Sequence, residues 1–210
     1  MTDTAEWQCI HTVGFPANRQ TRKGFMYYWQ VMRRVAARDG DVYGEMTEHR
    51  RIFVLFIVNL TVLGLIYGVA SAGLSQVVLA RLSAGSAGAR FSPLAVTVVG
   101  VLAVYLLHGA SALFVWVFCR GLGGRSRLTP YYLNMGVAGI ALWPVAPAVA
   151  CVQVGLGGAY LVAAVFMAGA WGAAVQYAAV QAASGLSHAK MTAAVIATLT
   201  YIGCFLYLWI

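Results

Sequence analysis

The sequence predicts an all-α, polytopic membrane protein with five transmembrane helices preceded by an amphipathic interfacial helix. Of its 210 residues, 61% are hydrophobic and only 10% are charged, whereas soluble domains carry about 25% charged residues. The apolar residues gather in five runs, each near the ~20 residues that cross a bilayer core. All six acidic residues lie in the first 48 positions, so a polar N-terminal tail precedes an apolar remainder.

The membrane domain is expected to occupy residues 52–210. Backbone amides find no water partner in lipid, so each apolar run is expected to form a helix. We expect the five spans at about residues 52–73, 93–118, 131–152, 156–180 and 191–210.

Residues 1–51 form a basic tail, and residues 25–38 within it show the spacing of an amphipathic helix. Phe25, Tyr28, Trp29 and Met32 recur at intervals of three and four residues, which places them on one face. We expect this face to anchor the helix in the lipid interface while cations contact anionic headgroups. The alternative is a helix packed on a partner protein. The cations concerned are Arg22, Lys23, Arg33, Arg34 and Arg38.

The basic residues predict the orientation of the chain in its membrane. Twelve Lys and Arg residues fall in the tail, the second loop and the fourth loop, and two fall on the other side. The positive-inside rule therefore places the N-terminus in the cytoplasm and the C-terminus outside. The tail also lacks the basic and apolar regions of a signal peptide. The Ala/Gly/Val/Arg-rich composition favours a bacterial inner membrane.

The second loop, "CRGLGGRSRLTPYY", carries Arg120, Arg125 and Arg127 between two apolar walls. Its glycines match neither the P-loop nor the dinucleotide-binding pattern, and no strand is predicted before it. We interpret the loop as a turn whose arginines fix topology, with contact to lipid headgroups or a partner as the alternative.

Composition argues against enzymatic chemistry in the membrane part. From His49 to Ile210 there is no carboxylate, which removes paired-carboxylate catalysis, carboxylate proton relays and carboxylate metal sites. Four scattered cysteines form neither a zinc pattern nor a disulfide framework. We expect no catalytic residue, no cofactor and no metal, and we assign the net charge of +8 to lipid headgroups rather than nucleic acid.

Three residues inside the spans are candidates for function. His108 lies deep in the second span, where an ionisable group is a functional hypothesis. Because no acid can pair with it, we favour a neutral histidine bonded to a backbone carbonyl or to a polar neighbour such as Asn59 or Gln176. Pro144 and Pro147 predict a kink in the third span, interpreted as a packing feature rather than a transport path.

Small residues predict close helix contacts. Gly64 and Gly68 form a small-xxx-small pair in the first span, and Gly169 and Gly172 lie in the fourth. Such positions let helix backbones approach in lipid. We favour contacts within the bundle over dimerisation.

Two stretches, "GLGGRSRLTPYYLNMGVAGIALWPVAP" and "WGAAVQYAAVQAASGLSHAKMTAAVIATL", resemble the Yip domain family over about residues 25–210. The family's W…GL-S-x-x-K-A element corresponds to Trp171, Gly185, Leu186, Ser187 and Lys190, with Met191 where a small residue is usual. The resemblance implies an amphipathic lead-in, five membrane helices and a cytosolic N-terminus. Eukaryotic members bind Rab-type GTPases in early secretory traffic, whereas prokaryotic members are inner-membrane proteins, and this composition looks prokaryotic.

Three functions are compatible with this sequence. The first is a non-enzymatic membrane scaffold or accessory subunit that binds or organises a membrane partner, within a larger complex. The second is a small transporter, channel or lipid-moving protein with a path near His108 and the Pro144/Pro147 kink. The third is an adaptor for a small GTPase. A water-filled cavity that reaches His108 would favour the second.

Overall fold

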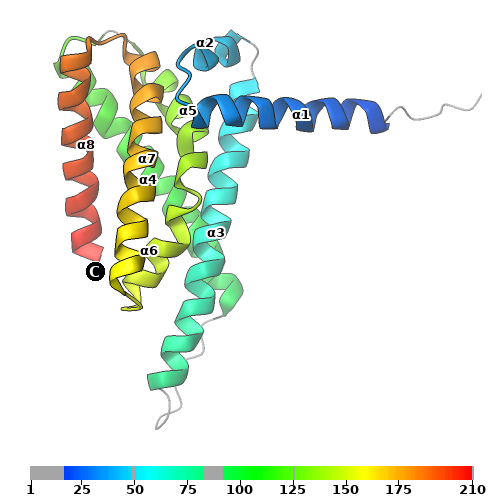
Figure 1. The fold of residues 1–210 in the computed structure, drawn as a ribbon, viewed down its shortest axis with the longest axis vertical. Helices are drawn as coiled ribbons and strands as arrows, with labels where there is room; N and C mark the ends of the chain where they lie inside the picture. The colour runs from blue at the N-terminus through cyan, green and yellow to red at the C-terminus, as the bar shows by residue number, and fades with distance from the viewer. Residues whose placement is uncertain (1–16, 49–50, 83–91, 125, 210) are drawn as a thin grey trace, which may run out of the picture.

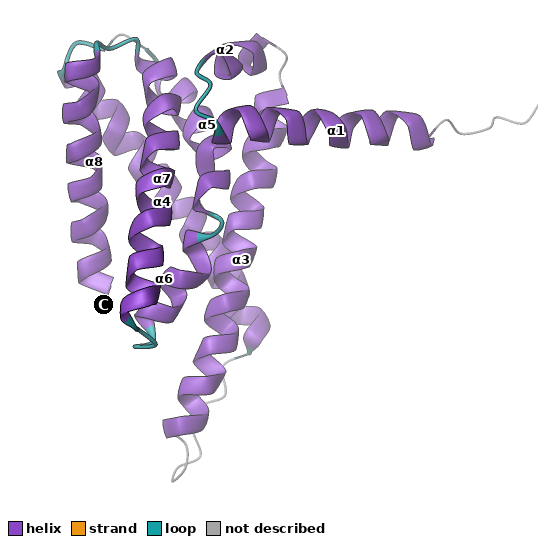
Figure 2. Cartoon of the chain, viewed as in Figure 1, coloured by secondary structure: helices purple, strands orange, loops and turns teal. Residues whose placement is uncertain are grey.

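A computed structural model describes residues 17–48, 51–82, 92–124 and 126–209. These residues form helices and connecting turns without a strand, so the all-α prediction is confirmed for this part of the chain (Figure 2). The elements in chain order are α1 (Ala17–Ala36), α2 (Asp41–Glu48), α3 (Arg51–Leu82), α4 (Pro93–Gly121), α5 (Leu128–Ala138), the 3-10 helix η1 (Gly139–Leu142), α6 (Val145–Gln153), α7 (Ala159–Ser184) and α8 (His188–Trp209).

Three of the described helices are long and apolar enough to cross a membrane, namely α3 over Arg51–Val77, α4 and α7. A fourth span is possible if the bent pair of Leu128–Leu142 and Val145–Gln153 is counted as one. The structure is therefore compatible with an integral membrane protein. The expected fifth span, 191–210, overlaps α8, which ends at Trp209, but the side chains of its last residues lie outside the described set. Five spans stay a prediction.

The third expected span is broken in the middle. Helix α5 tightens into η1, and α6 then starts with Pro144 as its N-cap, so the two halves meet at 73°. The bend lies at Pro144, as the sequence predicts. Pro147 lies in the first turn of α6, and the bend falls in the turn that precedes it. A proline has no amide hydrogen to donate to the carbonyl four residues earlier, so Pro147 is compatible with the predicted contribution to the kink.

The long helices alternate in direction, and the connections between them gather at two ends. Figure 1 shows α1 crossing the upper end of the bundle, with α2, the α4–α5 turn and the α7–α8 turn at the same end. We call this end, formed by α1, α2 and the turns at 122–127 and 185–187, the basic end. Its described cations are Arg33, Arg34, Arg38, Arg51, Arg120, Arg127 and Lys190.

Helices α3 and α4 approach most closely at glycines. A Cβ atom added to Gly68 would lie 2.6 Å from the Thr97 carbonyl oxygen, and one added to Gly100 would lie 2.7 Å from the Gly68 Cα atom. A Cβ at Gly64 would lie 3.0 Å from the Val101 Cα atom. The predicted packing role of Gly64 and Gly68 is confirmed.

The two glycines predicted to pack in the fourth span differ from each other. Gly172 of α7 faces η1, because an added Cβ would lie 2.9 Å from Leu142 Cδ2. Gly169 has open space around it, with no atom of the described structure within 4 Å of an added Cβ. The packing role expected of Gly169 is therefore wrong within this chain.

Replacing Gly68 or Gly100 with alanine should destabilise the bundle by about 1–3 kcal/mol, the usual cost of overpacking. Gly73→Ala and Gly109→Ala are matched controls in the same two helices, because an added methyl group meets nothing there. Unfolding of the four variants in detergent micelles would measure the difference. Equal stability of Gly68→Ala and Gly73→Ala would contradict the close α3–α4 contact.

Candidate functional site

The second half of α1 is built into the membrane bundle. Its Val31, Met32 and Val35 are buried in one hydrophobic core with residues of α2, α3, α5 and α7. Met32 is only 1% exposed. The apolar face of α1 thus packs on the protein's own helices, and burial of these side chains favours the docked position of α1.

A buried asparagine on α3 holds α1 in place. Asn59 is 0% exposed. Its Oδ1 accepts a 2.6 Å hydrogen bond from the Tyr28 hydroxyl, and its Nδ2 donates to the Val137 carbonyl oxygen at 2.9 Å and contacts Met32 Sδ at 3.1 Å. Trp143 Nε1 donates to the Asn59 backbone carbonyl at 3.2 Å. One amide therefore links α1, α3, α5 and the bend before α6, and we call these contacts the Asn59 network.

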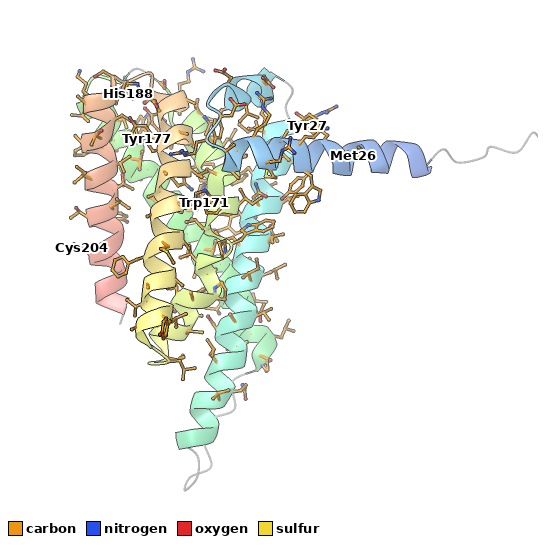
Figure 3. All side chains as sticks on the ribbon, in the orientation of Figure 1. Met26, Tyr27, Trp171, Tyr177, His188 and Cys204 are labelled. Carbon is orange, nitrogen blue, oxygen red and sulfur yellow. The ribbon has the colours of Figure 1, made fainter. Side chains whose placement is uncertain are left out.

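The Asn59 network changes the interpretation of the predicted lipid anchors. Burial raises the pKa of Tyr28, so its hydroxyl stays protonated and donates to Asn59. The expectation that Met32 anchors α1 in lipid is wrong, because its side chain is buried in protein. Tyr28 is partly buried, and its hydroxyl points to Asn59. Trp29, 52% exposed, keeps an outward position, and Met26 projects from the same helix (Figure 3). The side chains of Arg22, Lys23 and Phe25 lie outside the described set.

Arg34 joins α1 to α2 by ion pairs. Its Nη1 and Nη2 donate to the two carboxylate oxygens of Glu45 at 2.6 and 2.9 Å, and its Nε donates to Asp39 at 2.7 Å. These hydrogen bonds raise the pKa of Arg34 and lower that of Asp39. The sequence predicts that Arg34 contacts lipid headgroups or a partner; the structure pairs its guanidinium with the protein's own acids and leaves the side chain 39% exposed. Arg33 is exposed.

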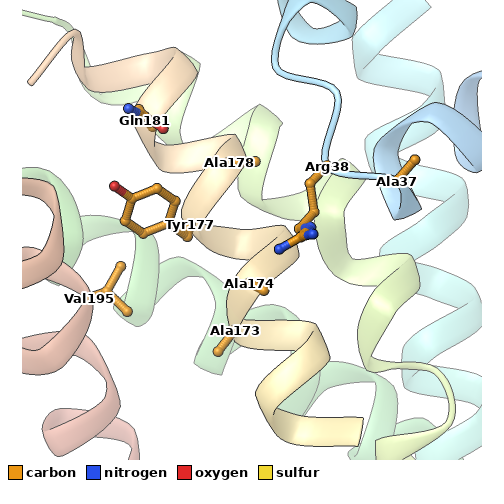
Figure 4. A pocket seen from close by; sticks show the side chains of 8 residues that line it. All are labelled: Ala37, Arg38, Ala173, Ala174, Tyr177, Ala178, Gln181 and Val195. Atoms are coloured by element: carbon orange, nitrogen blue, oxygen red, sulfur yellow. The ribbon is translucent and has the colours of Figure 1, made fainter. Parts of the chain in front are cut away.

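Arg38 follows the end of α1 with φ of 66°, the one positive φ outside glycine among the described residues. Its side chain lies over a groove of about 560 Å³ on the outer face of α7. Figure 4 shows Arg38 on one side of α7 and Tyr177 and Val195 on the other. The floor between them carries the small side chains of Ala173, Ala174 and Ala178.

A polar cluster closes the far side of this groove. His188 Nδ1 lies 3.1 Å from both the Tyr177 hydroxyl and Gln181 Nε2. Tyr177 is near the C-terminal end of α7, and His188 begins α8 (Figure 3). The cluster ties the two helices together at the basic end, beside a left-handed turn at Gly185 with φ of 63°. Only the polarity of these residues could have pointed to this cluster from the sequence.

The turn between α4 and α5 is held by side chains from two helices. Lys190 Nζ donates to the Leu122 carbonyl at 2.7 Å, and Trp116 Nε1 donates to the Ser126 carbonyl at 3.1 Å. Arg120 at the end of α4 and Arg127 on this turn are exposed, whereas Arg125 lies outside the described set. Hydrogen bonds from Trp116 and Lys190 thus hold this turn. Arg120 and Arg127 take no part in these two bonds and are exposed at the basic end.

His108 has a structural partner. Its Nε2 lies 3.0 Å from the Tyr132 carbonyl oxygen, which fits the backbone-carbonyl option predicted from the sequence. Its ring packs on Phe56 and Tyr132, with centroids 5.5 and 4.8 Å away. His108 is not among the residues that line the groove beside Arg38.

Comparison with known proteins identifies no relative: no family model, no curated protein and no solved structure matches this chain. Within the described residues, no group of three or more His, Cys, Asp or Glu side chains could hold a metal ion. The candidate site is therefore defined by geometry alone, as the basic end with α1 docked through the Asn59 network and the groove beside Arg38.

Acid should loosen α2 from α1. Because Arg34 lowers the pKa of Asp39 in the folded protein, its contribution to stability is complete above the ordinary value of 3.8 and is lost as pH falls through the lowered pKa. A spin label at residue 44 of α2 should report restricted motion at pH 7 and greater mobility near pH 3. In the Asp39→Asn variant, the label at residue 44 should show part of this increase in mobility already at pH 7.

A label at residue 106, on the exposed face of α4, is the control, because no acidic residue lies in that part of the chain. A label at residue 44 whose mobility is the same at both pH values and in Asp39→Asn would show that this ion pair does not hold α2.

Proposed function

We propose that the protein is a non-enzymatic integral membrane scaffold or accessory subunit that holds a membrane partner at its basic end. The observation that carries this proposal is the docking of α1 on the bundle through Asn59. A helix that is fixed on protein, rather than floating in lipid, presents its outward side chains in a constant position. Preorganised surfaces lose less freedom on binding, which favours a stable complex.

The outward side chains of the basic end support a partner with acidic or anionic surface. Arg33 of α1, Arg120 at the end of α4 and Arg127 of the α4–α5 turn are exposed, and Trp29 adds an aromatic side chain of the kind enriched at interfaces. Complementary charge raises the rate of association and selects partners. These cations come from segments far apart in the sequence that Figure 1 places at one end.

The proposal places the basic end in the cytoplasm and the C-terminus outside, in a bacterial inner membrane. The support is the distribution of Lys and Arg residues over alternate connections. Membership of the Yip domain family belongs to the same proposal, and it rests on the sequence resemblance alone. The contact between His108 and the Tyr132 carbonyl supports a structural histidine, and it favours a scaffold over a transporter.

Asn59→Leu should release the partner from the basic end, and Asn134→Leu should retain it. Both are buried amides of the bundle, but Asn134 makes one long hydrogen bond, of 3.4 Å, to Ala179. Loss of the Asn59 network should cost about 1–3 kcal/mol, because the part-buried Tyr28 hydroxyl loses its acceptor. Co-purification from native membranes in mild detergent, quantified by mass spectrometry, would measure the retained partner.

Arg120→Glu with Arg127→Glu gives a second test that leaves the Asn59 network intact. It should also reduce partner retention, because it reverses the charge of the basic end. Proton or substrate flux across proteoliposomes between pH 5 and 8, the range in which histidine titrates, tests the transporter instead. A wild-type flux that titrates in this range and vanishes in His108→Gln would overturn the scaffold.

A further inference from the structure

Arg38 holds its side chain over α7 in an unusual backbone conformation. Its φ of 66° belongs to the left-handed region that usually selects glycine at the end of a helix. Its amide donates to the Val35 carbonyl at 2.9 Å, and the Asp39 amide donates to the Arg34 carbonyl at 3.1 Å. Glycine could make the same helix end, so the backbone geometry does not require arginine at this position.

The guanidinium of Arg38 makes no hydrogen bond or ion pair with the residues that the structure describes, although acids are near in sequence. Asp39 and Glu45 both form ion pairs with Arg34 instead. A cation held beside an apolar helix face favours an anionic ligand, and a guanidinium matches the geometry of a phosphate.

The rest of the groove suits a hydrocarbon chain. Its floor consists of the Ala173, Ala174 and Ala178 methyl groups, and Val195 and the ring of Tyr177 form the opposite side (Figure 4). The small side chains of this floor let a flexible methylene chain lie close to α7 over residues 173–178. Burial of each methylene contributes favourably to binding.

The groove also lies toward the C-terminal end of α7, a helix long and apolar enough to cross a membrane. It runs from Ala173 to Gln181, which is about 12 Å along a helix at about 1.5 Å per residue. Gln181 is three residues before the end of α7 at Ser184. Arg38 belongs to the basic end, where the α7–α8 turn leaves the bundle. In a bilayer crossed by a helix, the ends of that helix lie near the level at which phosphates meet acyl chains.

We propose that this groove binds one anionic phospholipid, with its phosphate on Arg38 and an acyl chain along the alanines of α7. Charge favours this occupant over a helix of a partner protein. Helices α7 and α8 carry no acidic residue, so a partner helix would have to place an acidic residue of its own beside Arg38. An anionic headgroup supplies that charge. The lipid site goes beyond the proposed scaffold and does not depend on it.

Native mass spectrometry of the purified protein with phosphatidylglycerol or phosphatidylcholine tests the site. The wild type should retain one phosphatidylglycerol more tightly than phosphatidylcholine. Arg38→Gly should reduce this preference about fivefold to tenfold, and Ala174→Phe should remove the bound lipid by filling the floor. Arg33→Gln is the matched control, since Arg33 is exposed on α1 and does not line the groove. Glycerol phosphate, which lacks acyl chains, should not compete.

Arg38→Gly separates binding from folding, because glycine adopts this φ without strain. Its thermal melting temperature should be no lower than that of the wild type. Equal phosphatidylglycerol retention in the wild type and Arg38→Gly would overturn the site, as would an equal loss in Arg33→Gln. If Arg38→Gly and Ala174→Phe release a cross-linked protein chain and leave lipid retention unchanged, a partner helix occupies the groove and the proposal is wrong.

Discussion

The arrangement of the basic end depends on one buried amide inside an apolar helix. Asn59 has no access to solvent, so every polar atom it offers must be bonded within the protein. Its side chain meets this demand by joining Tyr28 of α1 to the Val137 carbonyl at the end of α5. An unsatisfied amide in hydrocarbon is costly, and this cost works against any position of α1 or α5 that breaks these contacts.

The position of α1 then determines the rest of the basic end. With Met32 and Val35 buried, the chain leaves α1 beside α7, which brings Arg38 over the alanine face. The ion pairs of Arg34 hold α2 against α1 and occupy the carboxylates of Asp39 and Glu45. The two arginines, four residues apart, therefore have different roles: Arg34 closes the turn between two helices, and Arg38 is left with its charge directed over a groove.

The sequence predicts local features of each helix better than it predicts which other elements that helix contacts. The helical class, the bend at Pro144, the close approach at Gly68 and the backbone partner of His108 follow from properties local to each residue. Periodicity also identifies the apolar face of α1, but it cannot say whether lipid or protein covers that face, and the lipid-anchor prediction for Met32 is therefore wrong. The role of Arg34 depends on a turn that brings Glu45 back to α1. Asn59 could have been identified as an anchor, since it is the one amide in the apolar part of its span.

The distance between α1 and the bundle tests this account most directly. Spin labels at residue 33 of α1 and residue 98 of α4 are both on exposed positions, and pulsed electron resonance in lipid nanodiscs measures the distribution of distances between them. We predict one narrow distribution in the wild type, a broad one in Asn59→Leu, and a narrow one in the matched variant Asn134→Leu. A broad distribution in the wild type, or the same narrow distribution in Asn59→Leu, would contradict the claim that Asn59 holds α1 on the bundle.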